Sequence, residues 1–143
     1  MSKTVEIGAD VASIMTIVAD FEAYPQWNEG IKGVWVIARY DDGRPSQLRL
    51  DIDIQGMEAT YIQAVYYPGV NQIHTVMQQG DLFSKQEQLF SVVEAGAASL
   101  LTVDIDVEPS MAVPALMVKM LLNNTLEHLT ENLKQRIEQS TAS

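Results

Sequence analysis

Cysteine is absent from this sequence, which excludes disulfide bonds, thiolate nucleophiles and cysteine-based zinc sites together. Histidine is scarce, because His74 and His128 are the only two in the chain and lie far apart along it. A zinc site would need carboxylates to complete its set of ligands. We therefore expect neither a bound metal nor a cofactor.

Long hydrophobic runs are also missing. No stretch approaches the roughly 18 apolar residues that a membrane-spanning helix needs, and the opening Met-Ser-Lys-Thr-Val-Glu lacks the apolar centre of a signal peptide. We expect a cytoplasmic protein that does not insert stably into membranes.

Positive charge is in short supply, with 9 lysine and arginine residues against 19 aspartate and glutamate residues and a net charge of −10. Nucleic acid would repel such a protein at neutral pH, so we do not expect it as a partner. The 143 residues, of which 47% are hydrophobic, fit one globular domain that spans residues 1–143.

The first part of the chain has strand and then helix patterns. Thr4 to Ile7 is predicted to be a short strand, and Asp10 stands where a helix N-cap belongs. Apolar residues then recur at helical spacing from Val11 to Val18. From Phe21 to Gly30 an aromatic residue comes at every third position, together with a proline that disfavours helix just before it. We expect an ordered connection there.

The middle of the chain, from Ile31 onward, has the pattern of six strands separated by five turns. Alternation is clearest in residues 47–54 and 101–108, where aliphatic residues occupy one face and polar residues the other. Short connections indicate an antiparallel meander with one face free to contact water. The turn signals are Asp41-Asp-Gly-Arg-Pro45, Gln55-Gly56, Pro68-Gly-Val-Asn71, Gly80-Asp81 and Glu94-Ala-Gly96.

The last third of the chain predicts one long apolar helix. It follows the strand Leu100 to Glu108 and is expected from about Val113 to Glu138, with Pro114 in its first turn. A helix this apolar must cover a hydrophobic surface, for which the sheet is the obvious candidate. We expect its methionine-rich first half to lie over the interior and its charged second half to lie outside.

The order of these elements resembles the helix-grip fold of the START-like, or SRPBCC, superfamily. The segment Ala9-Asp-Val-Ala-Ser-Ile-Met-Thr-Ile-Val-Ala-Asp-Phe-Glu-Ala-Tyr-Pro-Gln-Trp-Asn28 resembles the opening of its polyketide cyclase/dehydrase and lipid-transport group, closest to the mycobacterial and other actinobacterial members. The resemblance covers essentially the whole chain. It implies an α+β fold in which a curved antiparallel sheet of seven strands wraps around a long C-terminal helix, with short helices between the first two strands.

The same resemblance implies a cavity between sheet and helix that holds an apolar molecule. Members of the superfamily include cyclases and lipid carriers on one backbone, so the fold by itself does not select an activity. Their catalytic residues differ between branches, and no catalytic signature in this sequence transfers to it.

Aromatic residues are the first candidates for the cavity wall. Phe21, Tyr24 and Trp27 either line a pocket entrance or cap the core beside the first helix. We take Trp27 as the one that touches the cavity. Trp35 is a further candidate, but its strand is apolar on both faces, so alternation leaves its side of the sheet open.

Polar residues within strands are the second group of candidates. Tyr61 and Gln63 share one face of a strand, where a polar group facing a cavity would orient a ligand. The alternative is a side chain that is solvated or hydrogen-bonded within the protein. The strand after residue 83 is polar on both faces, and one of its alternating pairs, Lys85 with Glu87 or Gln86 with Gln88, is a candidate to face the cavity.

The terminal helix supplies the remaining candidates. Met117 and Met120 either fill the core or line a pocket that adapts to varied apolar shapes. Leu121 lies on the adjacent helix stripe that also holds Asn124 and His128. Asn124 and His128 lie one helical turn apart on a neighbouring stripe. They form either the boundary between core and solvent or the polar end of the pocket, where a histidine can carry protons.

Acidic residues gather on two strands in pairs that resemble acid/base or calcium-binding arrangements. Each set lies opposite four aliphatic residues and therefore on the solvent side of the sheet. We interpret them as a solvated acidic face. They are Asp51, Asp53, Asp104, Asp106 and Glu108.

Three hypotheses for function follow. The first is binding or transport of a hydrophobic small molecule, such as a lipid, fatty acyl or polyketide-like compound. The second is a cyclase- or dehydratase-type enzyme that uses His128 or another cavity group as general acid or base. The third is a module that binds a protein partner through an exposed apolar surface.

Overall fold

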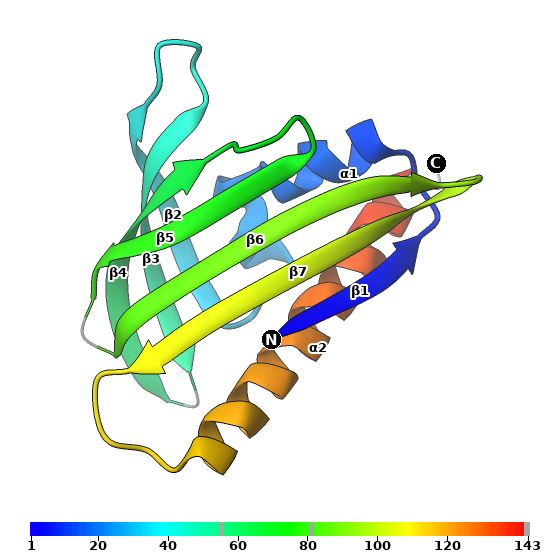
Figure 1. The fold of residues 1–143 in the computed structure, drawn as a ribbon. Coiled ribbons are helices and arrows are strands. Elements are labelled where there is room, and N and C mark those ends of the chain that lie inside the picture. Colours follow the sequence, from blue (N-terminus) through cyan, green and yellow to red (C-terminus); the bar gives the residue numbers. More distant parts are fainter. Residues whose placement is uncertain (55, 81, 142–143) are drawn as a thin grey trace.

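A seven-stranded antiparallel sheet is the framework of this computed structural model, which describes residues 1–54, 56–80 and 82–141. The strand order is β1-β7-β6-β5-β4-β3-β2, so that six strands form a consecutive meander and the N-terminal strand pairs with the last (Figure 1). The strands are β1 (Ser2–Ile7), β2 (Ile31–Arg39), β3 (Pro45–Ile54), β4 (Met57–Tyr66), β5 (Gln72–Gln79), β6 (Phe83–Ala95) and β7 (Ala98–Pro109).

The helices lie on one side of this curved sheet (Figure 1). Between β1 and β2 come α1 (Val11–Val18) and the 3-10 helix η1 (Phe21–Gln26), and the chain ends with α2 (Ala115–Thr141). Asp10 caps α1 as predicted, because its Oδ1 accepts a hydrogen bond from Ser13 N at 2.8 Å. The predicted helix-grip fold, with its sheet, terminal helix and short helices, is confirmed.

The predicted turns, where the structure describes them, lie at the ends of the meander strands or between them. Gly43 and Gly96 have φ angles of 90° and 68° in two of these turns, a backbone conformation that side chains with a Cβ rarely adopt. Gln55 and Asp81, which belong to two of the predicted turns, lie outside the described residues.

The core lies between the concave face of the sheet and the second half of α2. Strand residues such as Leu48, Leu101 and Val103 are fully buried, as are Leu133 and Ile137 on the helix. Alternation along β3 and β7 therefore predicted the inner face correctly.

The expectation for the two halves of α2 is wrong. Its charged second half is the part that packs, whereas the apolar first half is open to solvent, with Leu116 69% and Met117 59% exposed. The reason is position, because α2 contacts β1 and β7 and its beginning projects beyond the edge of the sheet (Figure 1). Apolar composition alone does not show how far the covering surface extends.

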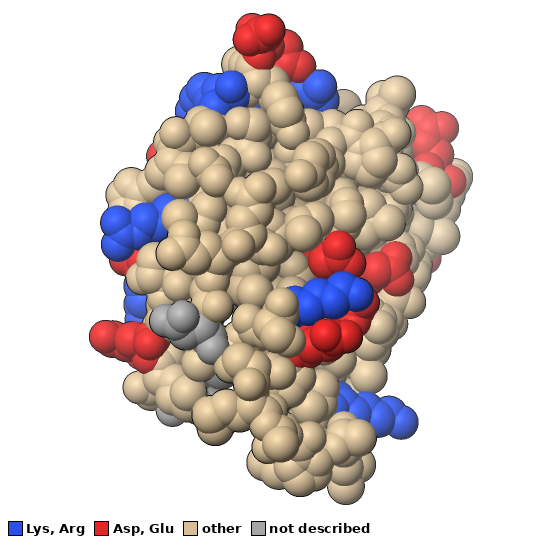
Figure 2. Space-filling view, turned by 60° about the vertical axis from the view of Figure 1, so that its left-hand side comes forward, with Lys and Arg blue, Asp and Glu red and all other residues tan. Residues whose placement is uncertain are grey.

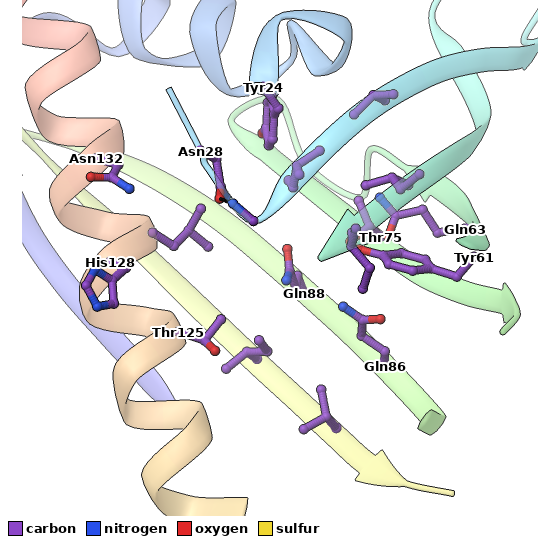
Figure 3. Close-up of a pocket in the computed structure, with 18 of the residues that line it drawn as sticks. Tyr24, Asn28, Tyr61, Gln63, Thr75, Gln86, Gln88, Thr125, His128 and Asn132 are labelled. Carbon is purple, nitrogen blue, oxygen red and sulfur yellow. Dashed lines mark hydrogen bonds between the residues drawn. The ribbon is translucent and has the colours of Figure 1, made fainter. Parts of the chain in front are cut away.

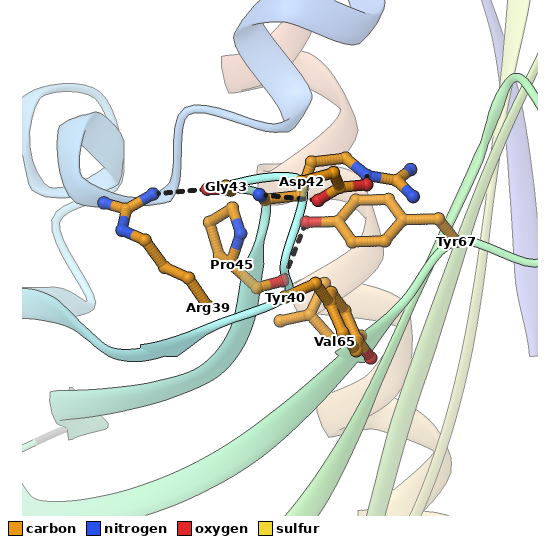
Figure 4. A network of polar contacts seen from close by, with 8 residues as sticks. Arg39, Tyr40, Asp42, Gly43, Pro45, Val65 and Tyr67 are labelled. Carbon is orange, nitrogen blue, oxygen red and sulfur yellow. Dashed lines mark hydrogen bonds and ion pairs between the residues drawn. The ribbon is translucent and has the colours of Figure 1, made fainter.

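The hairpin between β2 and β3 is hydrogen-bonded to the end of β4 and to the segment that joins β4 and β5 (Figure 4). Tyr67 donates its hydroxyl hydrogen to the carbonyl of Pro45 at 2.9 Å, and Tyr40 donates to the carbonyl of Val65 at 2.6 Å. The guanidinium of Arg44 lies 4.2 Å from the centre of the Tyr67 ring. These contacts join the β2–β3 hairpin to β4 and to the residue that follows it.

Charged side chains are scattered over the outside. Figure 2 shows a face made mainly of uncharged residues, with small groups of acidic and basic side chains around it. On the outer face of the sheet Lys85 donates to Asp106 at 2.7 Å, which places Lys85 and Glu87 outside and their neighbours in β6 inside. Within the described residues, no helix has the length and apolar character needed to cross a membrane.

Candidate ligand-binding cavity

A cavity of about 600 Å³ lies between the sheet, η1 and α2. Its volume is in the range typical of small-molecule sites, which are roughly 300–1,000 Å³. The inward-facing aliphatic residues of three strands form much of its wall. They include Val34, Leu48, Leu50, Ile52, Ile105 and Val107.

Aromatic side chains from η1 and the following residue form one end of the cavity. Phe21 and Tyr24 are buried, and the Tyr24 and Trp27 rings lie with centroids 4.6 Å apart. The Tyr24 hydroxyl donates to the carbonyl of Val18 at 2.5 Å. Burial, and to a lesser degree the Asp20 carboxylate, raises the pKa of Tyr24 far above its ordinary value. These aromatics therefore both line the cavity and close the core.

Polar side chains from three strands form a second region of the wall, here called the sheet-wall cluster (Figure 3). Gln63 and Thr75 are 8% and 3% exposed, and Thr75 is the direct cross-strand partner of Gln88. Alternation places all of them on the inner face, because positions two apart in a strand point the same way. The cluster consists of Tyr61 and Gln63 from β4, Thr75 from β5, and Gln86 and Gln88 from β6.

Tyr61 and Gln86 make contact within this cluster. Burial raises the pKa of Tyr61 to about 12, although a hydrogen bond with the Gln86 side chain acts in the opposite direction. The phenol is protonated at neutral pH, as a tyrosine with the ordinary pKa of 10 also is, and it is able to donate. Among the described residues, Gln86 Oε1 is a buried side-chain oxygen that has no hydrogen-bond partner.

The α2 side of the cavity carries polar residues across from the sheet-wall cluster (Figure 3). Asn124 and His128 line the cavity and are also exposed, which places them at its mouth. Thr125 and Asn132 line the same side and are half-buried. The two interpretations of Asn124 and His128 are therefore compatible. Both residues lie at the boundary with solvent, and both also form the polar edge of the pocket.

Six of the nine residues predicted for the cavity line it in the structure. Leu121 lies near the beginning of α2, where the helix first reaches the pocket. Whether any of the six contacts a ligand stays a prediction. They are Trp27, Tyr61, Gln63, Leu121, Asn124 and His128.

The other three predicted residues lie outside the cavity. Trp35 is 45% exposed, because Val34 takes the inward position on β2 and its neighbour must point outward, where Arg49 lies 5.1 Å from the Trp35 ring. Met117 and Met120 are 59% and 57% exposed, since they belong to the part of α2 that projects beyond the sheet. The alternatives left open for these three residues are decided by tertiary position, which places all three outside the cavity.

Sequence reasoning missed Thr75 and did not choose between the two polar pairs of β6. Gln86 and Gln88 face the cavity, whereas Lys85 and Glu87 face outward. The charge of the outer pair was a usable signal, because burying charge costs far more than burying an amide. Thr75 follows a histidine and precedes a valine, so alternation gave no signal for it.

The acidic residues behave largely as a solvated face. Asp104, Asp106 and Glu108 are exposed, and Asp51 accepts a hydrogen bond from Thr60 at 2.8 Å. Asp53 is half-buried and borders the cavity. The described residues contain no group of three or more histidine, cysteine, aspartate or glutamate side chains arranged to hold a metal ion.

Comparisons with known proteins agree with this architecture. A START superfamily protein from Mycobacterium smegmatis has a TM-score of 0.95 at 59% identity, over 99% of this chain and 98% of that one. A Thermus thermophilus protein has a TM-score of 0.82 at 15% identity, over 99% of this chain and 98% of that one. The Zhui aromatase/cyclase from Streptomyces has a TM-score of 0.76 at 13% identity, over 96% of this chain and 92% of that one. These last two show the fold alone.

Sequence comparison gives the family. No curated protein matches the chain. The model of the family described as polyketide cyclase / dehydrase and lipid transport matches residues 7–134, which is most of the chain. Together with the mycobacterial structure, this match shows that the chain belongs to the polyketide cyclase/dehydrase and lipid transport family, within the START-like superfamily.

Proposed function

We propose that this protein binds a hydrophobic small molecule, as a carrier or binding protein, in the cavity between the sheet and α2. The observation that carries the proposal is the cavity of about 600 Å³, whose wall combines aliphatic and aromatic side chains with polar ones. Each Å² of apolar surface that a ligand buries there contributes about 25 cal/mol. A lipid, fatty acyl or polyketide-like compound matches such a wall.

The similar proteins support the same proposal. The family description names lipid transport beside cyclase and dehydrase activity, and the Zhui protein is an aromatase/cyclase. Binding of an apolar molecule is common to these activities. We therefore infer that binding of an apolar molecule is the first candidate function and that an enzymatic activity is the second.

A cyclase- or dehydratase-type activity is the second candidate. The polar sheet-wall cluster and His128 at the mouth favour it, because catalysis of this kind needs a polar group within reach of the substrate. Tyr61 is a hydrogen-bond donor rather than a base at neutral pH, as any tyrosine with a pKa of 10 is, and burial raises its pKa further, to about 12. This favours holding a ligand over removing a proton from it.

Native mass spectrometry of the purified protein, followed by solvent extraction, tests the proposal. We expect a bound apolar molecule, or uptake of an added fatty acyl or polycyclic compound with one-to-one stoichiometry. A protein that repeatedly carries nothing and takes up no apolar compound would contradict it. Analysis of the extracted compound after incubation would show whether it is altered.

A matched pair of variants locates the binding. Val107 lines the cavity and is buried, whereas Val93 is 57% exposed. We expect Val107→Phe to reduce ligand uptake by filling part of the cavity, and Val93→Phe to leave uptake unchanged. Circular dichroism of both variants checks that the sheet is intact. Equal uptake by the two variants would place binding elsewhere.

A further inference from the structure

Five residues that line the cavity form one row across the sheet, from β3 to β7, here called the cross-strand row. Leu48 is the direct cross-strand partner of Gln63. Thr75 pairs in the same way with Gln88, and Gln88 with Ile105. Gln63 and Thr75 are diagonal neighbours on adjacent strands. Such neighbours share one face of a sheet, so three polar side chains lie between two aliphatic ones along the row.

The polar side chains of the row are buried in the protein and open to the cavity (Figure 3). Gln63 and Thr75 are 8% and 3% exposed, and no other side chain or backbone group within the described residues is hydrogen-bonded to either side chain. Their polar atoms are nevertheless reached from the cavity, unlike Gln86 Oε1, which the surrounding protein encloses. A ligand that displaces solvent from these atoms must form hydrogen bonds with them, because otherwise it leaves buried polar groups unpaired.

The cross-strand row also carries no charge. Its amides and its hydroxyl can each donate and accept, so they match a carbonyl or hydroxyl oxygen of a ligand. No lysine or arginine is among the described residues that line the cavity, and the carboxylates of Glu29 and Asp53 border it. An anionic ligand group placed against the row would be buried without a cation to pair with it, which is strongly unfavourable.

We infer that the ligand is uncharged and carries a carbonyl or hydroxyl group in its interior, with an apolar part on each side of that group. The oxygen binds at Gln63, Thr75 and Gln88, and the two apolar parts extend across the strands toward Leu48 on β3 and Ile105 on β7. The inference rests on the proposed function and narrows it. A fatty acid, or another amphiphile whose polar group lies at one end, does not match the order of side chains along the row.

Two isomeric fifteen-carbon ketones test the inference, one with its carbonyl at the central carbon and one with its carbonyl next to a chain end. The isomers have the same atoms and the same functional group. The second can place its oxygen on the polar residues only by leaving one apolar side of the row without contact. We expect the central ketone to bind about tenfold more tightly, as one well-placed hydrogen bond in a buried site allows. Competition against a fluorescent apolar dye measures both affinities.

Three variants show whether the polar residues of the row are responsible. Thr75→Val and Gln63→Met remove a hydroxyl and an amide at similar size, and Thr60→Val makes the first change at an exposed position on β4. We expect the preference for the central ketone to fall in each of the first two variants and to be lost when they are combined. The Thr60→Val protein should keep it. Unchanged binding of the end ketone shows that the combined variant is folded.

The possible outcomes separate this inference from the proposed function. Equal binding of the two ketones by the native protein, tighter binding of the end ketone, or a preference that survives in the combined variant would overturn the inference alone. Binding of neither ketone while another apolar compound binds would do the same. A protein that binds neither ketone and no other apolar compound would overturn both. The molecule extracted from the purified protein gives an independent measurement, in which a neutral compound with an interior oxygen supports the inference and a compound with a single terminal acid or phosphate contradicts it.

Discussion

Tyr24 and Trp27 pack against each other with ring centroids 4.6 Å apart and ring planes tilted by 51°. Tyr24 is tied to the end of α1 through Val18, and Trp27 reaches the cavity. The pair therefore links the first helix to the wall of the cavity. A change in either ring should affect both the free energy of unfolding and the binding of a ligand in the cavity. The two effects can be measured separately.

Replacement of Tyr24 by phenylalanine should lower the free energy of unfolding by about 1–2 kcal/mol, because it removes a buried hydrogen bond and leaves the Val18 carbonyl without its donor. Urea denaturation measures the change. Tyr66→Phe is the matched control, since Tyr66 is 45% exposed, and it should have little effect. Equal stability of the Tyr24→Phe and native proteins would contradict the importance of this bond.

The two tryptophans of the chain should report ligand binding differently. Trp27 lines the cavity and Trp35 lies on the outer side of β2. In the Trp35→Phe protein, where Trp27 is the remaining fluorophore, an apolar ligand should shift or quench the emission. The Trp27→Phe protein should bind with no comparable change in emission. A response from Trp35 alone would place the ligand on the outer face.

Removal of the α1 cap should destabilise the protein in a pH-dependent way. Hydrogen bonds from Ser13 hold the pKa of Asp10 below its ordinary value of 3.8. Because the folded-state pKa is depressed, the contribution of the ionised cap is complete above the unfolded-state pKa and is lost as pH falls through the folded-state pKa.

Urea midpoints at neutral and acid pH check this prediction. Asp10→Ala should be less stable than the native protein near neutral pH, and the difference should shrink in strongly acid solution. Glu94→Ala, a change at an exposed carboxylate in β6, is the control and should show a smaller effect. A difference that stays constant down to acid pH would show that the charge of Asp10 is not involved.

The two halves of α2 should respond differently to truncation. Leu133 is fully buried, so Leu133→Ala should lower the free energy of unfolding by about 2–5 kcal/mol. Met117 is 59% exposed, and Met117→Ala should change it by less than about 0.5 kcal/mol. Chemical denaturation of the two variants measures both values. Similar losses would mean that the first half of the helix is packed against another surface.

Local patterns predicted most of the fold. The cap at Asp10 and the alternation in β3 and β7 depend on residues close in sequence, so these features could be predicted directly. Tyr61 and Gln63 could be assigned to one face for the same reason. Their sequence pattern does not show whether this face of β4 points to the cavity or to solvent, because that depends on how the whole sheet packs.

The failures share a different cause. The strand that holds Trp35 is apolar on both faces, so its orientation is set by the packing of neighbouring strands rather than by its own sequence. The exposure of Met117 depends on where the sheet ends beneath α2, which no local pattern records. The choice between the two polar pairs of β6 was left open rather than missed, and the structure places Gln86 inside and Lys85, which donates to Asp106, outside.

The cavity has a mechanical consequence as well. The folded chain contains a cavity of about 600 Å³. Any part of this cavity that neither solvent nor ligand fills adds to the volume of the folded state. Hydrostatic pressure favours the state of smaller volume and therefore acts against such a fold. A ligand that fills the cavity removes this excess volume, so that resistance to pressure becomes a measure of how completely the interior is occupied.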